Sequence, residues 1–191
     1  TAHLARQICR GIESVAGANS ILRTVPSLAA ESERPVQAVP DSGAPYATLA
    51  ELKRADGLLI GSPTRFGNMA APLKHFLDST SSLWLDGSLV GKPAAAFTAS
   101  QSMHGGQEST LLTMLLPLLH HGMYLVGIPF THRELSETRS GGSPYGASHV
   151  AGVAERPAQL SDAEQVLAQA LGARVARLAV TLAESSPTHR G

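Results

Sequence analysis

Apolar residues follow two kinds of spacing along this chain, and each predicts a different element. Near the start, Leu4, Ile8 and Ile12 recur every four residues, which predicts an amphipathic helix over residues 1–16. Similar patterns, the last opened by a Ser161-Asp162-Ala163-Glu164 capping box, predict helices at residues 48–56, 72–80, 107–121 and 161–182. Short, largely apolar runs, which are typical of strands buried on both faces, lie at residues 57–61, 94–99 and 123–128, and residues 20–25 are a further short strand candidate.

The order of these elements predicts the fold class. Apolar strands that alternate with helices, with no hairpin signal between them, indicate an α/β fold with a doubly wound parallel sheet and helices on both faces. Such a sheet ordinarily opens with a strand, whereas this pattern opens with a helix. We therefore expect a five-stranded sheet whose first strand and phosphate-binding turn precede Thr1 in the natural protein and are absent from this chain. Residues 1–191 are expected to form a single domain, with irregular regions at residues 26–47 and 129–160.

The composition argues against several kinds of partner and environment. Fifteen Lys and Arg balance fifteen Asp and Glu, so the formal net charge is zero and no nucleic-acid partner is expected. The single cysteine, Cys9, excludes an internal disulfide and fits a reducing compartment. The most apolar stretch, residues 111–129, is interrupted by Pro117 and by His120-His121-Gly122, so no integral membrane association is expected. The expected location is therefore cytoplasmic.

Candidate chemistry lies at the carboxyl ends of the predicted strands, where open parallel sheets bind their ligands. Thr1 stands at a helix start, whose unpaired N–H groups can hold an anion. The first segment, residues 62–68, offers backbone amides and the planar guanidinium of Arg65. The second segment, residues 99–107, contains glycines and runs into a helix. One anion site and two amide-rich segments are what FMN requires for its phosphate and its flat ring.

Five short sequences carry a resemblance to a known family. They are GSPTRFGNM at residues 61–69, LDSTSSLW at 77–84, GGQE at 105–108, LLHHGM at 118–123 and GGSPYGA at 141–147. Together and in this order they resemble the WrbA-type NAD(P)H:quinone oxidoreductases, a flavodoxin-like family. The resemblance extends from Thr1 to about Gly152. It implies non-covalently bound FMN, a homotetramer, a quinone substrate, and NADH or NADPH as co-substrate.

The resemblance also implies roles for particular residues. Trp84 matches a tryptophan that lines the substrate space. The second segment departs from the family, because it is one residue longer and carries Met103 and His104 where small residues are usual. The residues implied to bind the cofactor are Thr1, Pro63, Thr64, Arg65, Phe66, Gly67, Ala99, Ser100, Gln101, Ser102, Met103, His104, Gly105 and His120. No metal site is expected, because the adjacent His120 and His121 diverge by roughly 100° on a helix.

The residues alone leave simpler interpretations open. Arg65 could be a solvated surface charge, Phe66 a core residue, and Trp84 a packing residue, while one of the two adjacent histidines could cap its helix. With the family resemblance, the expected function is an FMN-dependent NAD(P)H:quinone oxidoreductase with a ping-pong mechanism and no strictly required catalytic side chain. The alternatives are a flavodoxin-type electron carrier and a non-catalytic flavin-binding regulatory partner. A carrier usually presents an acidic docking surface, which this neutral chain lacks.

Overall fold

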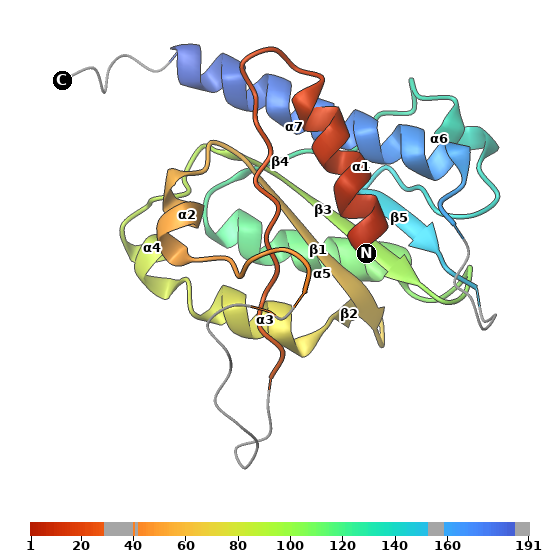
Figure 1. Ribbon diagram of the computed structural model, residues 1–191, viewed down its shortest axis with the longest axis horizontal. Coiled ribbons are helices and arrows are strands. Elements are labelled where there is room, and N and C mark those ends of the chain that lie inside the picture. The colour runs from red at the N-terminus through yellow and green to blue at the C-terminus, as the bar shows by residue number, and fades with distance from the viewer. Residues whose placement is uncertain (29–39, 41, 153–158, 186–191) are drawn as a thin grey trace.

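A short, mostly parallel sheet forms the centre of the molecule. The computed structural model describes residues 1–28, 40, 42–152 and 159–185. Strands β1 (Leu58–Arg65) and β3 (Pro93–Ser100) run parallel, and β2 (Asn68–Met69) pairs antiparallel with the end of β1. Strands β4 (Tyr124–Leu125) and β5 (Ala147–Val150) both run parallel to β3 (Figure 1). Because β4 pairs with the amino end of β3 and β5 with its carboxyl end, the two together fill one strand position.

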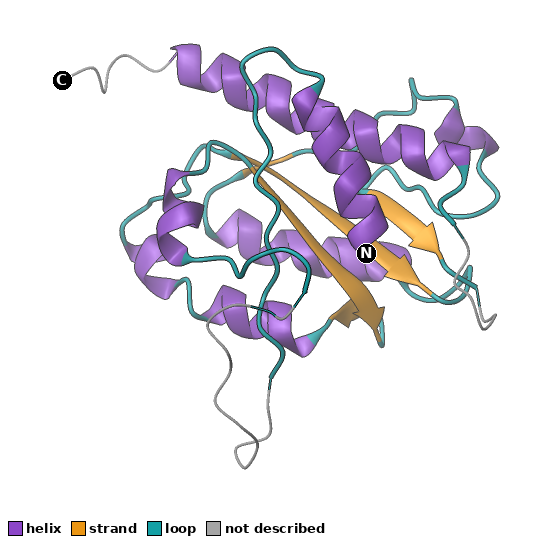
Figure 2. Ribbon diagram, in the orientation of Figure 1, coloured by secondary structure: helices purple, strands orange, loops and turns teal. Residues whose placement is uncertain are grey.

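Helices cover both faces of the sheet, as Figure 2 shows. One face carries α1 (Ala2–Glu13) and α7 (Asp162–Ser185), which pack against each other and against Phe97 of β3. The other face carries α2 (Leu49–Arg54), α3 (Ala71–Asp78), α4 (Ser81–Leu85) and α5 (Gln107–His120). A short helix, α6 (Glu134–Glu137), contacts α7. Each face has its own apolar core, so the predicted α/β architecture with helices on both faces is confirmed.

Two helices open with a capping box, and the one at Ser161 was predicted from the sequence. Thr48 Oγ1 accepts a hydrogen bond from Glu51 N–H, and the Glu51 carboxylate accepts one from Thr48 N–H. Ser161 and Glu164 form the same reciprocal pair at the start of α7. Each pair satisfies N–H groups that a helix start leaves without a partner.

Helix α7 is the one helix in the described part of the chain that is long and apolar enough to cross a membrane. Its Leu167, Leu171 and Val175 are buried against the sheet and α1. The helix is therefore placed as the core helix of an α/β fold.

Several predicted elements were wrong in extent. The first helix ends at Glu13 instead of residue 16. The predicted strand at residues 20–25 is wrong, since its described pairing is the isolated bridge between Thr24 and Tyr46. Pro26 and Pro45 beside that bridge lack the N–H groups that a longer ladder needs. Part of the predicted irregular region at residues 26–47 lies outside the described residues.

The strand predicted at residues 57–61 continues to Arg65 and then turns back as a β-hairpin, which the sequence pattern did not predict. Residues 62–65, expected in a loop, pair with β3 as far as Pro63, which lies opposite Ala99. Phe66 and Gly67 form the turn with φ angles of 52° and 75°. Positive φ at both central residues is the geometry of a tight hairpin turn, but Phe-Gly is not among its usual sequences.

Further elements lie where the sequence predicted none. Helix α4 lies between the predicted helix at residues 72–80 and the predicted strand at residues 94–99. Helix α6 and strand β5 lie within residues 129–160, which were predicted to be irregular. Strand β5 can approach β3 because residue 146 is glycine: a Cβ there would lie 2.1 Å from Ala96 O. The strand predicted at residues 123–128 is limited to Tyr124–Leu125.

Candidate functional site

The first and second segments meet at the carboxyl end of the sheet. Thr64 Oγ1 lies 2.6 Å from Thr110 Oγ1 in the first turn of α5. The same hydroxyl lies 3.4 Å from Gly105 O and 3.5 Å from Gly106 O. The sequence-predicted Thr64 and Gly105 are therefore brought together, and Thr110, which no sequence signal marked, joins them.

The turn of the hairpin touches the start of α5 backbone to backbone. Gly106 has a φ of 86°, and a Cβ on it would lie 2.9 Å from Gly67 Cα. No side chain fits between the two segments at this point. Glycine is required here both for the positive φ and for the close approach.

Polar side chains hold the segments in shape. Ser62 Oγ accepts a hydrogen bond from Ala70 N–H at 2.8 Å, which fixes the return of the hairpin into α3. Gln107 Nε2 donates to Ser102 O at 2.9 Å and to Met103 O at 2.8 Å. Gln107 lies within the GGQE sequence, so its role had a signal in the sequence, although it was not among the predicted site residues.

The groups between these anchors are free for a ligand. The N–H groups of residues 101–104 have no hydrogen-bond partner in the described part of the chain. Phe66 is fully exposed and Met103 is about half exposed, so the interpretation of Phe66 as a core residue is wrong. The Arg65 guanidinium donates to the carbonyl oxygen of the preceding residue, Thr64, and no acidic partner faces it among the described residues.

A groove lies beside the first segment. It has a volume of about 670 Å³, which is within the range of small-molecule sites. It runs along β2 and the first turn of α3. Its lining residues are Arg65, Asn68, Met69, Ala70, Ala71, Pro72 and Lys74.

Trp84 and His120 lie together, but far from these segments. Trp84 Nε1 donates to His120 O at 2.9 Å. Helix α5 begins at the carboxyl end of β3 and ends beside the amino end, where Gly91 N–H donates to Gly122 O. Its 14 residues span about 20 Å. Within one chain, the predicted site is therefore divided into two groups at opposite ends of the sheet.

His121, the neighbour of His120, has a structural position. It is buried at the end of α5, with Nε2 at 2.8 Å from Thr80 Oγ1. Because Thr80 Oγ1 donates to Leu77 O, His121 Nε2–H is the donor in this pair and its buried Nδ1 is left without a partner among the described residues. Burial, assisted by the charge of His120, lowers the pKa of His121. His121 is the C-cap residue of α5 through its backbone N–H, while its side chain bonds Thr80 and not the helix carbonyls.

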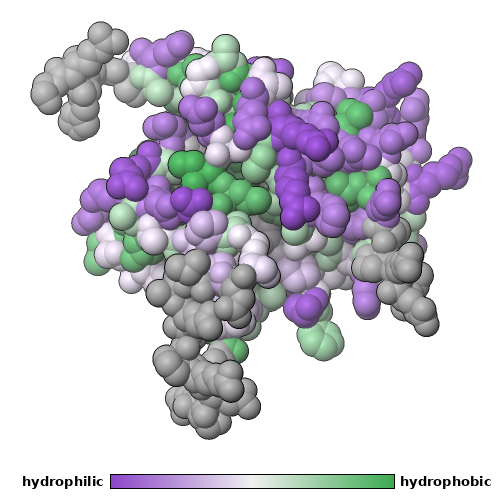
Figure 3. All heavy atoms as spheres, viewed as in Figure 1, coloured by the Kyte–Doolittle hydropathy of each residue, from purple (hydrophilic) through white to green (hydrophobic). Residues whose placement is uncertain are grey.

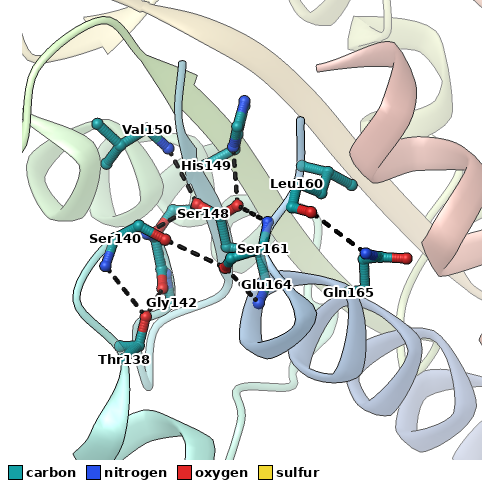
Figure 4. Close-up of polar contacts among 11 residues, drawn as sticks. Thr138, Ser140, Gly142, Ser148, His149, Val150, Leu160, Ser161, Glu164 and Gln165 are labelled. Carbon is teal, nitrogen blue, oxygen red and sulfur yellow. Dashed lines mark hydrogen bonds and ion pairs between the residues drawn. The ribbon is translucent and has the colours of Figure 1, made fainter. Parts of the chain in front are cut away.

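A buried carboxylate joins β5 to α7 beside the second segment (Figure 4). Glu164 accepts hydrogen bonds from the N–H groups of Ser161, Gly141 and Val150 at 2.8, 2.8 and 3.1 Å. Its Oε2 also lies 2.9 Å from His149 Nδ1. Burial alone would raise the pKa of Glu164, but these hydrogen bonds outweigh it and the pKa is lowered. Glu164 is therefore ionised at neutral pH.

Comparison with known proteins assigns the family. The family described as NADPH-dependent FMN reductase matches residues 15–132, and this range is more than half of the chain. The chain belongs to this family. A protein of Trichlorobacter lovleyi named NAD(P)H dehydrogenase (quinone) is 41% identical to this FMN reductase family member over 94% of the chain and 91% of its own length. A protein of the same name from Geobacter sulfurreducens is 46% identical over 78% of the chain and 77% of its own length.

Solved structures agree on the fold of this family member. A structure described as the flavodoxin, WrbA-like protein from Agrobacterium tumefaciens superposes with a TM-score of 0.61, at 23% identity over 94% of this chain and 88% of its own. A flavodoxin from the domain Archaea gives a TM-score of 0.56, at 19% identity over 94% and 90% of the two chains. The fold is therefore flavodoxin-like, and the WrbA-type resemblance seen in the sequence is confirmed.

Proposed function

We propose that this FMN reductase family member is an FMN-dependent NAD(P)H:quinone oxidoreductase that reduces quinones to hydroquinones by two electrons, with NADH or NADPH as co-substrate. The proposal is supported by the relatives from two organisms that are named for this activity and share 41% and 46% of the aligned residues. The formal net charge of zero argues against an electron carrier with an acidic docking surface. We also propose a cytoplasmic location, which the single cysteine supports.

The observation that carries the proposal is the row of four unpaired N–H groups at residues 101–104, beside a turn that exposes Arg65 and Phe66. A flavin ring has carbonyl and nitrogen acceptors along one edge and flat apolar faces. The free N–H groups suit that edge, and the exposed ring of Phe66 and the thioether of Met103 suit the faces. The residues therefore fit FMN.

Each proposed residue has a task of binding or orientation. The start of α1 at Thr1 suits the phosphate, because the first N–H groups of a helix point outward. When bound, FMN supplies the exchange of two electrons between nicotinamide and quinone, so no catalytic acid or base is assigned. The proposed cofactor-binding residues remain Thr1, Pro63, Thr64, Arg65, Phe66, Gly67, Ala99, Ser100, Gln101, Ser102, Met103, His104, Gly105 and His120, with Trp84 against the substrate.

The division of these residues between two ends of the sheet supports a shared site. Trp84 is half exposed, and its indole N–H is already bound to His120 O. If Trp84 and His120 face a flavin, that flavin is held by the first and second segments of another subunit. We therefore propose a homotetramer in which the substrate space lies between chains.

A spectroscopic experiment tests the function. Purified protein reconstituted with FMN should bleach near the flavin absorption maximum when NADH or NADPH is added without oxygen, and should recover its colour when benzoquinone is added. Protein without FMN, treated in the same way, is the control. A flavin that remains oxidised with both nucleotides would refute the enzyme and leave a carrier or a flavin-binding partner.

A further inference from the structure

On the face of the sheet that carries α1, the paired residues nearest the carboxyl ends of the strands include His149, which was not predicted as a site residue. Pro63 of β1 lies opposite Ala99 of β3, and Ala99 lies opposite His149 of β5. Residues paired across parallel strands point to the same face of the sheet. Pro63 and Ala99 are both proposed to bind the cofactor. His149 is therefore the third member of one row across the site.

This row lies directly beyond the first turn of α1. Two residues earlier along the strands, Phe97 and Ala147 share a core with Leu4 and Ala5 of α1, and α1 contacts β5. Because side chains on one face recur every second residue, His149 stands next to that core on the side of the strand ends. It thus lies between the helix start at Thr1 and the second segment.

The hydrogen bonds of His149 define what its free nitrogen can do. The side chain is more than nine-tenths buried, and Nδ1 lies 2.9 Å from the ionised Glu164. A carboxylate only accepts, so Nδ1 carries the proton and donates it. In the neutral ring Nε2 is then a bare acceptor. Figure 4 shows Nδ1 of the ring facing Glu164 and the other end of the ring directed away from it. Nε2 has no partner in the described part of the chain and is not fully enclosed.

The chemistry of that acceptor selects one part of a flavin. A phosphate dianion has no proton to donate, and the ring edge is mostly acceptors. The hydroxyl groups of the ribityl chain are donors, and this chain joins the phosphate to the ring. An acceptor between the proposed phosphate and ring positions therefore matches the ribityl chain.

We infer that His149 is a further cofactor-binding residue, whose Nε2 accepts a hydrogen bond from a ribityl hydroxyl while Glu164 holds the ring in place. The inference rests on the proposed function, because it requires that FMN binds at the strand ends. It also gives Glu164 a second task besides capping α7: it fixes the tautomer and the direction of His149.

Flavin fragments separate this contact from a general effect on the site. His149→Asn retains a donor close to the position of Nδ1, so the bond to Glu164 can persist, but removes Nε2. His75→Asn, at an exposed position of α3, is the matched control. Affinities for FMN, riboflavin and lumiflavin would be measured by fluorescence quenching on protein stripped of flavin, with thermal unfolding recorded for each variant.

We expect His149→Asn to weaken FMN and riboflavin by the same factor, on the order of fivefold, and to leave lumiflavin, which lacks the ribityl chain, unchanged. The control should change none of the three. Weakening of FMN alone would assign His149 to the phosphate, and equal weakening of lumiflavin would make its role structural; either result overturns the inference. Unchanged affinities would overturn it as well. If the unsubstituted protein binds no flavin at all, the proposed function itself is refuted.

Discussion

At the scale of single residues, Arg65 is the charged side chain that most directly tests the site. Its side chain is exposed and its described hydrogen bond is to the adjacent carbonyl Thr64 O, so it contributes little to the free energy of unfolding. We expect Arg65→Ala to weaken FMN or nucleotide binding on the order of tenfold and to change the free energy of unfolding by less than about 0.5 kcal/mol. Binding titration and thermal unfolding are the measurements. Arg54→Ala, at an exposed position at the end of α2, is the control, and a variant that melts lower yet binds FMN normally would make Arg65 structural.

Some site residues could be predicted from the sequence, and others could not. Thr64 and Gly105 could be predicted as site residues, because small residues after a strand end indicate a ligand-binding edge of the sheet. In the structure, Thr64 Oγ1 lies 3.4 Å from Gly105 O. Thr110 and His149 could not be marked in this way. Thr110 lies inside a helix, and His149 lies in a strand that was expected to be irregular. Their positions depend on pairings between distant segments, which no local pattern expresses.

At the scale of elements, Glu164 controls the attachment of α7 to β5. Because its folded-state pKa is lowered, it contributes stability that is present above its unfolded pKa and is lost as the pH falls through the folded pKa. We expect Glu164→Gln to lower the free energy of unfolding at pH 7 by about 2 kcal/mol and to reduce the loss of stability on acidification. Urea unfolding at pH 7 and at acid pH measures both effects.

The control for this experiment is Glu137→Gln, because the Glu137 side chain is largely exposed on α6. Glu51 also has a lowered pKa, of about 2, owing mainly to its hydrogen bond from Arg23. Glu51 is unchanged in both variants, so its contribution to the loss of stability at acid pH is the same in both. An unaltered acid response in Glu164→Gln would contradict the assignment.

Elements whose own sequence carries a strong pattern were predicted well. Helices with a clear apolar stripe or a capping box, such as α1 and α7, were found to within a few residues. The strand at residues 57–61 was extended by four residues, because its pairing with β3 overrides the turn preference of Gly-Ser-Pro. Strand β5 was missed because its stability comes from β3 and from Gly146, and its own four residues have no strong pattern.

At the scale of the whole molecule, the first prediction concerns assembly. Large apolar residues remain exposed within residues 78–90 and 129–152, which we expect to form subunit interfaces. Figure 3 shows a separate apolar patch amid a largely hydrophilic face. The exposed apolar residues in the two expected interface regions are Trp84, Leu85, Val90, Phe130 and Tyr145. If subunits share the flavin site, FMN must favour the tetramer by mass action. Sedimentation with and without saturating FMN tests this, and a monomer under both conditions would exclude a shared site.

The flat shape of both substrates determines the expected order of substrate binding. The nicotinamide and the quinone are both flat, and under the proposed function both would stack on the same bound flavin ring. If one side of that ring opens to one pocket, each must leave before the other enters, and excess quinone should compete with the nucleotide. Initial rates against NADH at several quinone concentrations should then give parallel double-reciprocal lines. Intersecting lines would mean that both substrates bind together.

The way β4 and β5 share one strand position has a consequence for divergence among relatives. The chain leaves the sheet after β4 and returns to the same edge of β3, and Ile128 N–H closes the base of this excursion on Pro144 O at 3.0 Å. Between these points, residues can be inserted or deleted without shifting any pairing of the sheet. The part of the proposed subunit contact that lies in this excursion can therefore change in length or sequence while β4 and β5 keep their pairing with β3.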